Sequence, residues 1–184
     1  SKGDVLLRSG AQKGDRLYVA GELGMAELGL RLQRLSARPD GRALRAHLYP
    51  EPQCELGRYL AARRLASAAM DLSDGLSTDL DRLCAASGVG ARVFAGQIPC
   101  VSSRAALALS RAAALSLALH GGEDYKLLFT VPPKSVPRLP AAFRRAPLVE
   151  IGEVTARRAV VLVSATGAER PLVPGGYDHF RRRR

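Results

Sequence analysis

Short apolar segments with the pattern of β-strands alternate along the chain with segments of helical periodicity. Residues 15–21 alternate as a strand, and residues 25–36 then repeat apolar side chains at helical spacing. A second apolar run at 68–72 leads directly into a predicted helix at 76–87. Further strands are predicted at 91–95, 125–131, 148–154 and 159–165, and further helices at 42–49, 55–67, 103–117 and 136–144. With no repeats or low-complexity linkers, this alternation predicts one layered α+β domain with a mixed sheet.

The length and composition are those of a single globular domain. The chain has 184 residues, of which 47% are hydrophobic and 24% are charged. No apolar run approaches the roughly 18 residues that a membrane span needs, and the N-terminus lacks the apolar region of a signal peptide. The three cysteines, Cys54, Cys84 and Cys100, lie far apart in the sequence, which favours reduced thiols in a cytoplasmic protein over a structural zinc site.

The net charge of +11 points to an anionic partner without identifying it. Four of the positive charges lie together in Arg181–Arg184 at the C-terminus. Binding to nucleic acid is not favoured, because aromatic residues are few and no nucleic-acid-binding motif is present. A phosphate-bearing small molecule suits the charge equally well, and so does an acidic half of the protein outside this sequence.

Residues 70–77, MDLSDGLS, place the carboxylates of Asp71 and Asp74 where a predicted strand becomes a helix. Ligands bind at such junctions in layered α/β folds, where the free N–H groups of the helix face them. The two carboxylates and the hydroxyl between them can hold Mg²⁺ through oxygen atoms, beside a polyphosphate. The alternative is a helix cap made by Asp74 or Ser77. A cap leaves Asp71 unexplained, because a carboxylate at the end of a buried strand is unfavourable unless it is liganded.

Residues 120–125, HGGEDY, place two glycines and two acids directly before a predicted buried strand. Glycines let a backbone come close to a ligand, and Glu123 and Asp124 can bind a metal or a cationic group of a substrate. An ordinary turn with solvated acids explains this segment equally well. His120 has no second His or Cys nearby in the sequence and is interpreted as structural.

Two further segments carry weaker signals. Residues 8–15, RSGAQKGD, place basic residues around glycines and can clamp a phosphate, although a basic turn is usually only solvated. They do not match the Walker A loop, and no GxGxxG fingerprint is present. Residues 175–180, GGYDHF, carry two aromatic side chains that can stack on a flat heterocycle or anchor the C-terminus to the core.

Taken together and in this order, these segments resemble the thiamine-monophosphate kinase family. The matching stretches, which cover nearly the whole chain, are RSGAQKGD, YVAGELGMAELGL, HLYPEP, AAMDLSDGLSTDL, SGVGA, ALHGGEDYKLLFTVP, IGEV and GGYDHF. MDLSDGLS and HGGEDY, with the terminal GYDHF, are specific as a set. The family belongs to a superfamily of ATP-using enzymes with aminoimidazole ribonucleotide synthetase and selenophosphate synthetase, and the chain resembles its C-terminal domain.

The resemblance implies that residues 1–184 are the single C-terminal domain of a two-domain kinase, with residues 1–14 as the connection from an N-terminal domain. It implies phosphorylation of thiamine monophosphate to thiamine diphosphate with ATP and Mg²⁺, by in-line transfer without a covalent intermediate. In the family, the N-terminal domain supplies further magnesium-binding aspartates and the interface of a homodimer. The chain alone is therefore expected to be inactive. Neither a nucleic acid nor a membrane is an expected partner.

The resemblance also implies roles for individual residues. They are Asp71 and Asp74 as magnesium ligands, Asp74 also as a catalytic residue, Arg8 and Ser73 as ATP contacts, and Glu123 and Tyr177 as contacts of thiamine monophosphate. Since the thiazolium of this substrate is cationic, the charge of Glu123 is suited to complement it.

The sequence departs from the family pattern at three places. Lys126 stands where an acid is expected, Gln53 stands where Arg is expected, and Arg181–Arg184 extend past the usual end. Two other functions stay open at this point. One is a sibling ATP-dependent enzyme with a different acceptor, and the other is a non-catalytic domain that binds a phosphorylated ligand.

Overall fold

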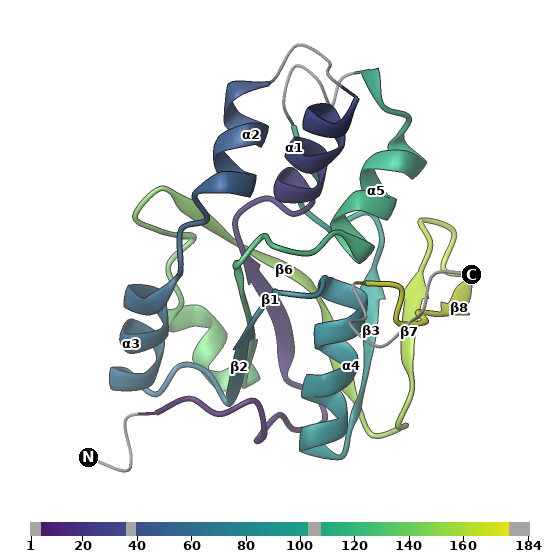
Figure 1. Cartoon of the computed structure of the whole chain (residues 1–184). Helices are drawn as coiled ribbons and strands as arrows, with labels where there is room; N and C mark the ends of the chain where they lie inside the picture. The colour runs from purple at the N-terminus through teal and green to yellow at the C-terminus, as the bar shows by residue number, and fades with distance from the viewer. Residues whose placement is uncertain (1–4, 36–39, 103–107, 177–184) are drawn as a thin grey trace.

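The computed structural model describes residues 5–35, 40–102 and 108–176, and a mixed sheet of eight strands lies at its centre (Figure 1). The strands are β1 (Arg16–Ala20), β2 (Ala68–Asp71), β3 (Gly90–Phe94), β4 (Leu127–Val131), β5 (Ala142–Phe143), β6 (Ala146–Thr155), β7 (Val160–Val163) and β8 (Glu169–Pro171). Their order is β2-β4-β1-β6-β3-β7-β8, with β5 paired to β6 off this path. The β3–β7 pair is parallel, and the neighbouring β3–β6 pair is antiparallel, so the predicted mixed sheet is confirmed.

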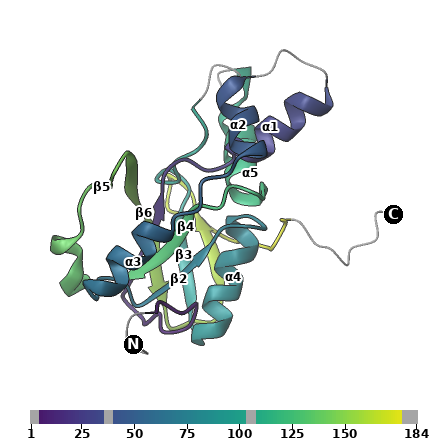
Figure 2. The same cartoon turned by 60° about the vertical axis from the view of Figure 1, so that its left-hand side comes forward.

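Helices cover both faces of this sheet and one end of it. They are α1 (Met25–Arg34), α2 (Gly41–Leu48), α3 (Cys54–Ala62), α4 (Leu76–Ser87), α5 (Arg111–His120) and the short 3₁₀ helix η2 (Pro133–Arg138). Figure 2 shows the sheet between α3 on one side and α4 on the other. Helices α1, α2 and α5 gather beyond the end of the sheet (Figures 1 and 2). The predicted layered α+β class is therefore confirmed.

Two apolar cores hold these layers together. On one face of the sheet, Leu76, Leu80 and Leu83 of α4 are fully buried, and their spacing of four and three residues puts them on one side of the helix. On the other face, Leu56 and Leu60 of α3 are buried in the same way. Burial of each such side chain contributes about 2 kcal/mol to folding. The packing of α4 against the sheet fixes the position of the strand–helix junction at residues 71–76.

The structure corrects the predicted helix at 136–144. Residues 133–138 form the 3₁₀ helix η2, and Ala142–Phe143 pair with β6 as the short strand β5. Pro137 has no N–H to donate, so it cannot continue an α-helix from Pro133. This segment is therefore a 3₁₀ helix followed by a short strand, and not an α-helix.

Other element boundaries also differ from prediction. Helix α3 ends at Ala62, before the predicted end at residue 67, because Arg64 adopts a left-handed φ of 50°. Helix α5 starts at Arg111, and the earlier part of the predicted helix, residues 103–107, lies outside the described residues, as does the end of the one predicted at 25–36. Strand β8 was not predicted, because its three residues are all exposed and carry no alternation. None of the described helices is long and apolar enough to cross a membrane.

Candidate active site

Main-chain hydrogen bonds join the turn after β2 to the loop before β4. The Glu123 N–H donates to the Ser73 carbonyl at 2.9 Å, and the Tyr125 N–H donates to the Leu72 carbonyl at 2.9 Å. The Leu72 N–H donates in return to the carbonyl of Lys126 at 2.9 Å. These bonds continue the antiparallel β2–β4 ladder past the ends of both strands. The segments MDLSDGLS and HGGEDY, which lie about 50 residues apart, therefore form one edge of the molecule.

Glycine is required where these two segments meet. Gly75 has a φ of +102°, and a Cβ at this position would lie 3.0 Å from the carbonyl oxygen of Gly121. A Cβ at Gly122 would lie 2.7 Å from the carbonyl oxygen of Ser73. Any larger residue at Gly122 would push the turn and the loop apart. Gly122 thus lets the two segments of the site approach each other, and the approach of a ligand to these glycines stays a prediction.

Asp124 is a structural residue. Its side chain is only 6% exposed and accepts hydrogen bonds from the N–H groups of Gly24, at 2.6 Å, and Ala26, at 3.0 Å. The first N–H groups of a helix have no acceptor within the helix. Asp124 therefore caps the N-terminus of α1, although it lies about 100 residues away in the sequence. Burial raises the pKa of Asp124, while the two hydrogen bonds and the charge of Lys126 oppose that rise. Of the two acids in HGGEDY, Asp124 is therefore not available to bind a metal or a substrate.

Asp79 is the buried carboxylate of the other segment. It has no exposed surface, and its Oδ2 accepts a hydrogen bond from the Asp74 N–H at 2.9 Å. Burial raises the pKa of Asp79, and the bond from Asp74 counteracts part of this effect. Asp79 thus fixes the backbone of the turn from inside α4. Helix α4 begins after Gly75 and has no side-chain cap, so neither Asp74 nor Ser77 makes the cap that was the alternative reading.

The charges of three other carboxylates raise the pKa of Tyr125. The negative charge of Glu123 is the largest cause that raises the pKa of Tyr125, followed by burial and then by Asp71 and Asp74. Asp71 and Glu123 are both exposed. Asp71 at the end of β2 therefore needs no ligand to offset burial, because its exposed carboxylate is open to water. The main-chain pairing of the two segments nevertheless places Asp71, Asp74 and Glu123 along one edge, named the acidic edge, and their roles there stay a prediction.

Arg82 supplies the positive charge next to these acids. Its guanidinium pairs with Asp74, and the same Nη1 donates to Oδ1 of Asp79 at 2.9 Å. The side chain of Asp74 is only 17% exposed, so its charge is partly shielded from water by this pair. Arg82 therefore balances the charge of Asp74 and orients its carboxylate. The sequence analysis did not single out Arg82, although its spacing of three residues from Asp79 on a helix was a usable signal.

Main-chain N–H groups of Gly175 and Gly176 bond to side chains in the first turn of α4. The N–H of Gly175 donates to the Ser77 hydroxyl and that of Gly176 to the Thr78 hydroxyl, each at 3.2 Å. The Ser77 hydroxyl also bonds to Nδ1 of His120 at 2.9 Å. Burial lowers the pKa of His120, which keeps the ring neutral, and this fits its predicted structural role. Tyr177 itself lies outside the described residues.

The two residues implied as ATP contacts lie at opposite ends of α4. Ser73 lies in the turn before the helix, and its carbonyl is bonded to Glu123. The carbonyl of Arg8 instead accepts from the hydroxyl of Ser87, the last residue of α4, at 3.3 Å. A helix of 12 residues is about 18 Å long. The main chain of Arg8 is thus distant from the acidic edge.

The donor set of this edge fits one side of a magnesium site. Across the described ranges, no three side chains of His, Cys, Asp or Glu form a group able to hold a metal ion. Asp71 and Asp74 still offer the carboxylate oxygens that Mg²⁺ prefers. Protein-bound Mg²⁺ commonly takes one or two carboxylates and fills its other positions with phosphate and water. The exposed carboxylate of Asp71 and the partly exposed carboxylate of Asp74 are suited to this arrangement, with the remaining ligands supplied from outside the described residues.

A cavity of about 490 Å³ opens beside the acidic edge. Asp71 and Tyr125 line one part of it. Most of the remaining wall is apolar and comes from the N-terminal segment, α3 and the strands β2 and β4, through Val5, Leu6, Pro52, Cys54, Gly57, Ala61, Ala69, Met70 and Leu127. Its size is within the range of small-molecule sites. The edge therefore combines carboxylates with an adjoining apolar hollow.

Comparisons with known proteins show the family of this domain. The family described as "AIR synthase related protein, C-terminal domain" matches residues 12–164. The thiamine-monophosphate kinase of Escherichia coli (strain K12) is 38% identical over 185 residues, which cover 97% of this chain and 56% of the relative. A crystal structure of thiamine-monophosphate kinase from Stenotrophomonas maltophilia K279a has 35% identity and a TM-score of 0.78, covering 88% of this chain and 54% of that one.

A second solved structure carries ligands in its description. "AaThiL complexed with AMPPCP and TMP" has 28% identity and a TM-score of 0.76, and it covers 95% of this chain and 54% of that chain. The chain thus spans about half the length of the relatives that it matches. The fold is that of a layered α+β domain, and the chain belongs to the AIR synthase related protein family as its C-terminal domain. Within this family, it is similar to the thiamine-monophosphate kinases.

Proposed function

We propose that this chain supplies half of the active site of a thiamine-monophosphate kinase, which transfers the γ-phosphoryl group of ATP to thiamine monophosphate. The observation that carries the proposal is the junction of MDLSDGLS, with Asp71 and Asp74, and HGGEDY, with Glu123, which main-chain hydrogen bonds hold together. Similarity to kinases that act on thiamine monophosphate, and to a structure described with AMPPCP and TMP, supports the choice of substrates. The transfer forms a bond from an acceptor phosphate oxygen to the γ-phosphorus and releases ADP.

The residues at the edge suit a reaction that needs positioning more than proton transfer. The acceptor is a phosphate, already ionised at neutral pH, so no strong general base is required. The main task is to hold two anionic groups in line and to offset their charge. Mg²⁺, when bound, supplies this offsetting charge. The carboxylates of Asp71 and Asp74 would hold it, and Arg82 keeps that of Asp74 oriented.

The remaining proposed contacts with ATP and thiamine monophosphate are assigned from the positions of four residues. Ser73 lies in the same turn as Asp74, where its hydroxyl can reach a phosphate of ATP. Arg8, at the other end of α4, is proposed to contact a more distant part of an extended nucleotide. Glu123 is exposed at the edge, where its charge can attract the cationic thiazolium of the substrate. Tyr177 follows Gly176, whose N–H is held by Thr78, and it would contact the same substrate.

The rest of the protein must complete this site. Because the chain spans about half of its relatives, we infer that an N-terminal domain adds magnesium ligands and the surface for a homodimer. The isolated chain should then bind ligand weakly and turn over little. A cytoplasmic location remains a prediction.

Formation of thiamine diphosphate from thiamine monophosphate and Mg-ATP tests the proposal. The reaction should be measured for this chain alone and for this chain joined to the coding sequence upstream of it. We expect product only from the joined form. If the joined form binds ATP but makes no thiamine diphosphate, a sibling enzyme with another acceptor or a non-catalytic binding domain replaces the kinase.

A further inference from the structure

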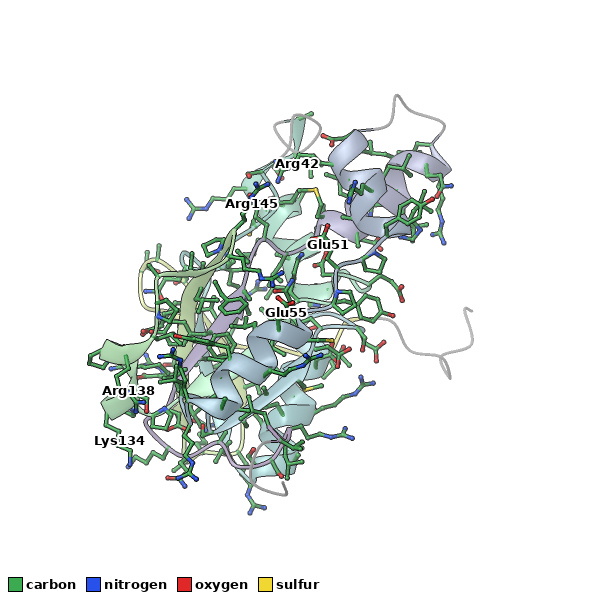
Figure 3. The ribbon with its side chains drawn as sticks, turned by 90° about the vertical axis from the view of Figure 1, so that its left-hand side faces the viewer. Arg42, Glu51, Glu55, Lys134, Arg138 and Arg145 are labelled. Atoms are coloured by element: carbon green, nitrogen blue, oxygen red, sulfur yellow. The ribbon has the colours of Figure 1, made fainter. Side chains whose placement is uncertain are left out.

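A second cavity lies on the other side of the segment that links α2 to α3. It has a volume of about 450 Å³, and its wall includes residues of α1, α2, the loop before β4 and the first residues of β6. Figure 3 faces this side of the molecule, with Arg42 and Arg145 close together in its upper part and Glu51 below them. Neither Asp71, Asp74 nor Glu123 lines this cavity.

Four cationic side chains line this cavity, and they come from three separate parts of the fold. Arg42 and Arg45 belong to α2, Lys126 precedes β4, and Arg145 directly precedes β6. Like charges brought to one hollow repel each other, and this repulsion is relieved when an anion binds among them. A group of cations assembled from distant segments around a concave surface is therefore a candidate anion site.

The acids in this wall do not neutralise all of these cations. Glu22 accepts from Arg42 at 3.2 Å and also bonds to the Ser102 hydroxyl. Asp124 is occupied by the main-chain N–H groups at the start of α1. Glu51 lies 3.6 Å from Arg45, and both side chains are 73% exposed, so this pair is weak in water.

Lys126 and Arg145 are the other two cationic side chains in the wall of this cavity. Within the described residues, neither side chain comes within 4.0 Å of a carboxylate oxygen to form an ion pair. The stem of Lys126 runs past Gly21, where a Cβ would lie 3.7 Å from its Cδ and Cε atoms. Arg145 is exposed at the start of β6, which lies next to the strand that Gly21 follows. Lys126 acts on Asp124 through its charge alone, so both cations can turn to a ligand without breaking an ion pair.

We propose that this cavity binds a small molecule that carries a phosphate group, with Lys126 and Arg145 holding the phosphate. Guanidinium and ammonium groups are the usual protein partners of phosphate oxygens. Tyr49 lies in the same wall and is 71% exposed, so its ring is free to stack on a flat heterocycle of the ligand. Lys126 and Gln53, two of the places where the sequence departs from the pattern of the family that it resembles, both line this cavity. The proposal does not depend on the kinase function.

Calorimetric titration of the 184-residue chain with pyrophosphate, in the presence of EDTA, tests this site. Without Mg²⁺, the three carboxylates of the acidic edge repel pyrophosphate, so binding reports on the cationic cavity. We expect saturable binding to one site. The double variant Lys126→Ala/Arg145→Ala should bind at least about tenfold more weakly, since each cation contributes a charge-assisted hydrogen bond.

A matched control separates a site from general attraction to a basic chain. Lys134→Ala/Arg138→Ala removes the same two charges from the other end of the same face (Figure 3). This control should retain the affinity of the unmodified chain, and circular dichroism should show that both variants fold. Absence of saturable binding, an unchanged affinity in Lys126→Ala/Arg145→Ala, or an equal loss in the control would each overturn the proposal.

A second titration distinguishes two sources of the phosphate. ADP and pyrophosphate share the diphosphate group, and only ADP can also place a ring on Tyr49. Tighter binding of ADP, lost in Tyr49→Ala while pyrophosphate is unaffected, would support a nucleotide-like ligand in this cavity. Equal affinities that Tyr49→Ala leaves unchanged would support a ligand recognised by its phosphates alone.

Discussion

The acidic edge contains two kinds of carboxylate, and they differ in burial more than in sequence context. Asp79 and Asp124 are buried, and each accepts hydrogen bonds from main-chain N–H groups. Asp71 and Glu123 are exposed and accept no hydrogen bond from the residues that the structure describes. Glu123 and Asp124 are adjacent in sequence, and nevertheless Glu123 is exposed and Asp124 is buried. The buried acids hold the edge in shape, and the exposed acids are left free for ligands.

This difference suggests how stability and function are divided at the edge. A buried carboxylate with main-chain partners is costly to remove, because its donors are left unpaired. An exposed carboxylate contributes little to folding, so its loss should affect binding or catalysis alone. The variants below test this division, in order of decreasing expected effect on the folded chain.

Asp124→Ala should have the largest effect on stability. It leaves the N–H groups of Gly24 and Ala26 without their acceptor, and we expect the free energy of unfolding to fall by about 3 kcal/mol. Urea denaturation measures the change. The neighbouring variant Glu123→Ala should change the free energy by less than about 0.5 kcal/mol. Similar losses in the two variants would show that burial does not separate these acids.

Gly122→Ala should separate the two segments of the edge. The added Cβ would lie 2.7 Å from the Ser73 carbonyl oxygen, and we expect a loss of about 2 kcal/mol in the free energy of unfolding, measured in urea. Gly57→Ala is the matched control, because it adds a methyl to α3 where no atom lies within 4 Å. Its expected effect is a gain of about 0.5–1 kcal/mol. A loss in the control, or none in Gly122→Ala, would contradict the described packing.

The pH dependence of stability should report the buried state of Asp124. Burial raises the pKa of Asp124 above the ordinary value of 3.8, so the folded chain holds this proton more firmly than the unfolded chain. The stability that this group contributes is present below pH 3.8 and is lost as the pH rises through the folded pKa. Asp124→Asn should remove this loss. Unfolding free energies measured at several pH values should then fall less with rising pH than in the unmodified chain, and identical slopes would exclude the effect.

Glu123→Gln should have the smallest effect on the fold and a local effect on Tyr125. The negative charge of Glu123 is the largest cause that raises the pKa of Tyr125 above 10.0, so its removal should lower this pKa. Nuclear magnetic resonance of chains with ¹³C-labelled tyrosine rings measures the titration of Tyr125 separately from the other tyrosines. Glu55→Gln, an exposed acid on α3, should leave the Tyr125 titration unchanged. An equal response to both variants would place Glu123 away from Tyr125.

The strand and the helix that flank the site were predictable from the sequence. Which of its acids are buried and which are exposed was not. The strand at 68–72 and the helix at 76–87 follow from apolar periodicity, and they correctly place Asp71 and Asp74 at a junction. The sequence could not separate Glu123 from Asp124. That difference arises from a contact distant in sequence, because the Asp124 carboxylate accepts from the N–H groups at the start of α1 while Glu123 stays exposed.

Contacts between distant segments explain the other omissions. The pairing of HGGEDY with MDLSDGLS depends on the β2–β4 ladder, which local patterns do not reveal. The cationic cavity joins Arg42, Lys126 and Arg145, which lie far apart in the chain. An α-helix was predicted at 136–144, where the structure has the end of the 3₁₀ helix η2 and the short strand β5. Pro137, which has no N–H to donate, was the sequence signal against an α-helix.

The most direct test of the account is the rate of thiamine diphosphate formation by the joined protein carrying Asp74→Asn. Asp81→Asn is the control, because Asp81 is an exposed acid on the same helix that does not line the acidic edge. We predict that Asp74→Asn lowers kcat at least about a hundredfold, since removing one group that stabilises transition-state charge has effects of this size. Its free energy of unfolding should stay close to that of Asp81→Asn, which keeps its activity. Full activity in the Asp74→Asn protein would contradict the central claim that the carboxylates of the MDLSDGLS turn serve phosphoryl transfer.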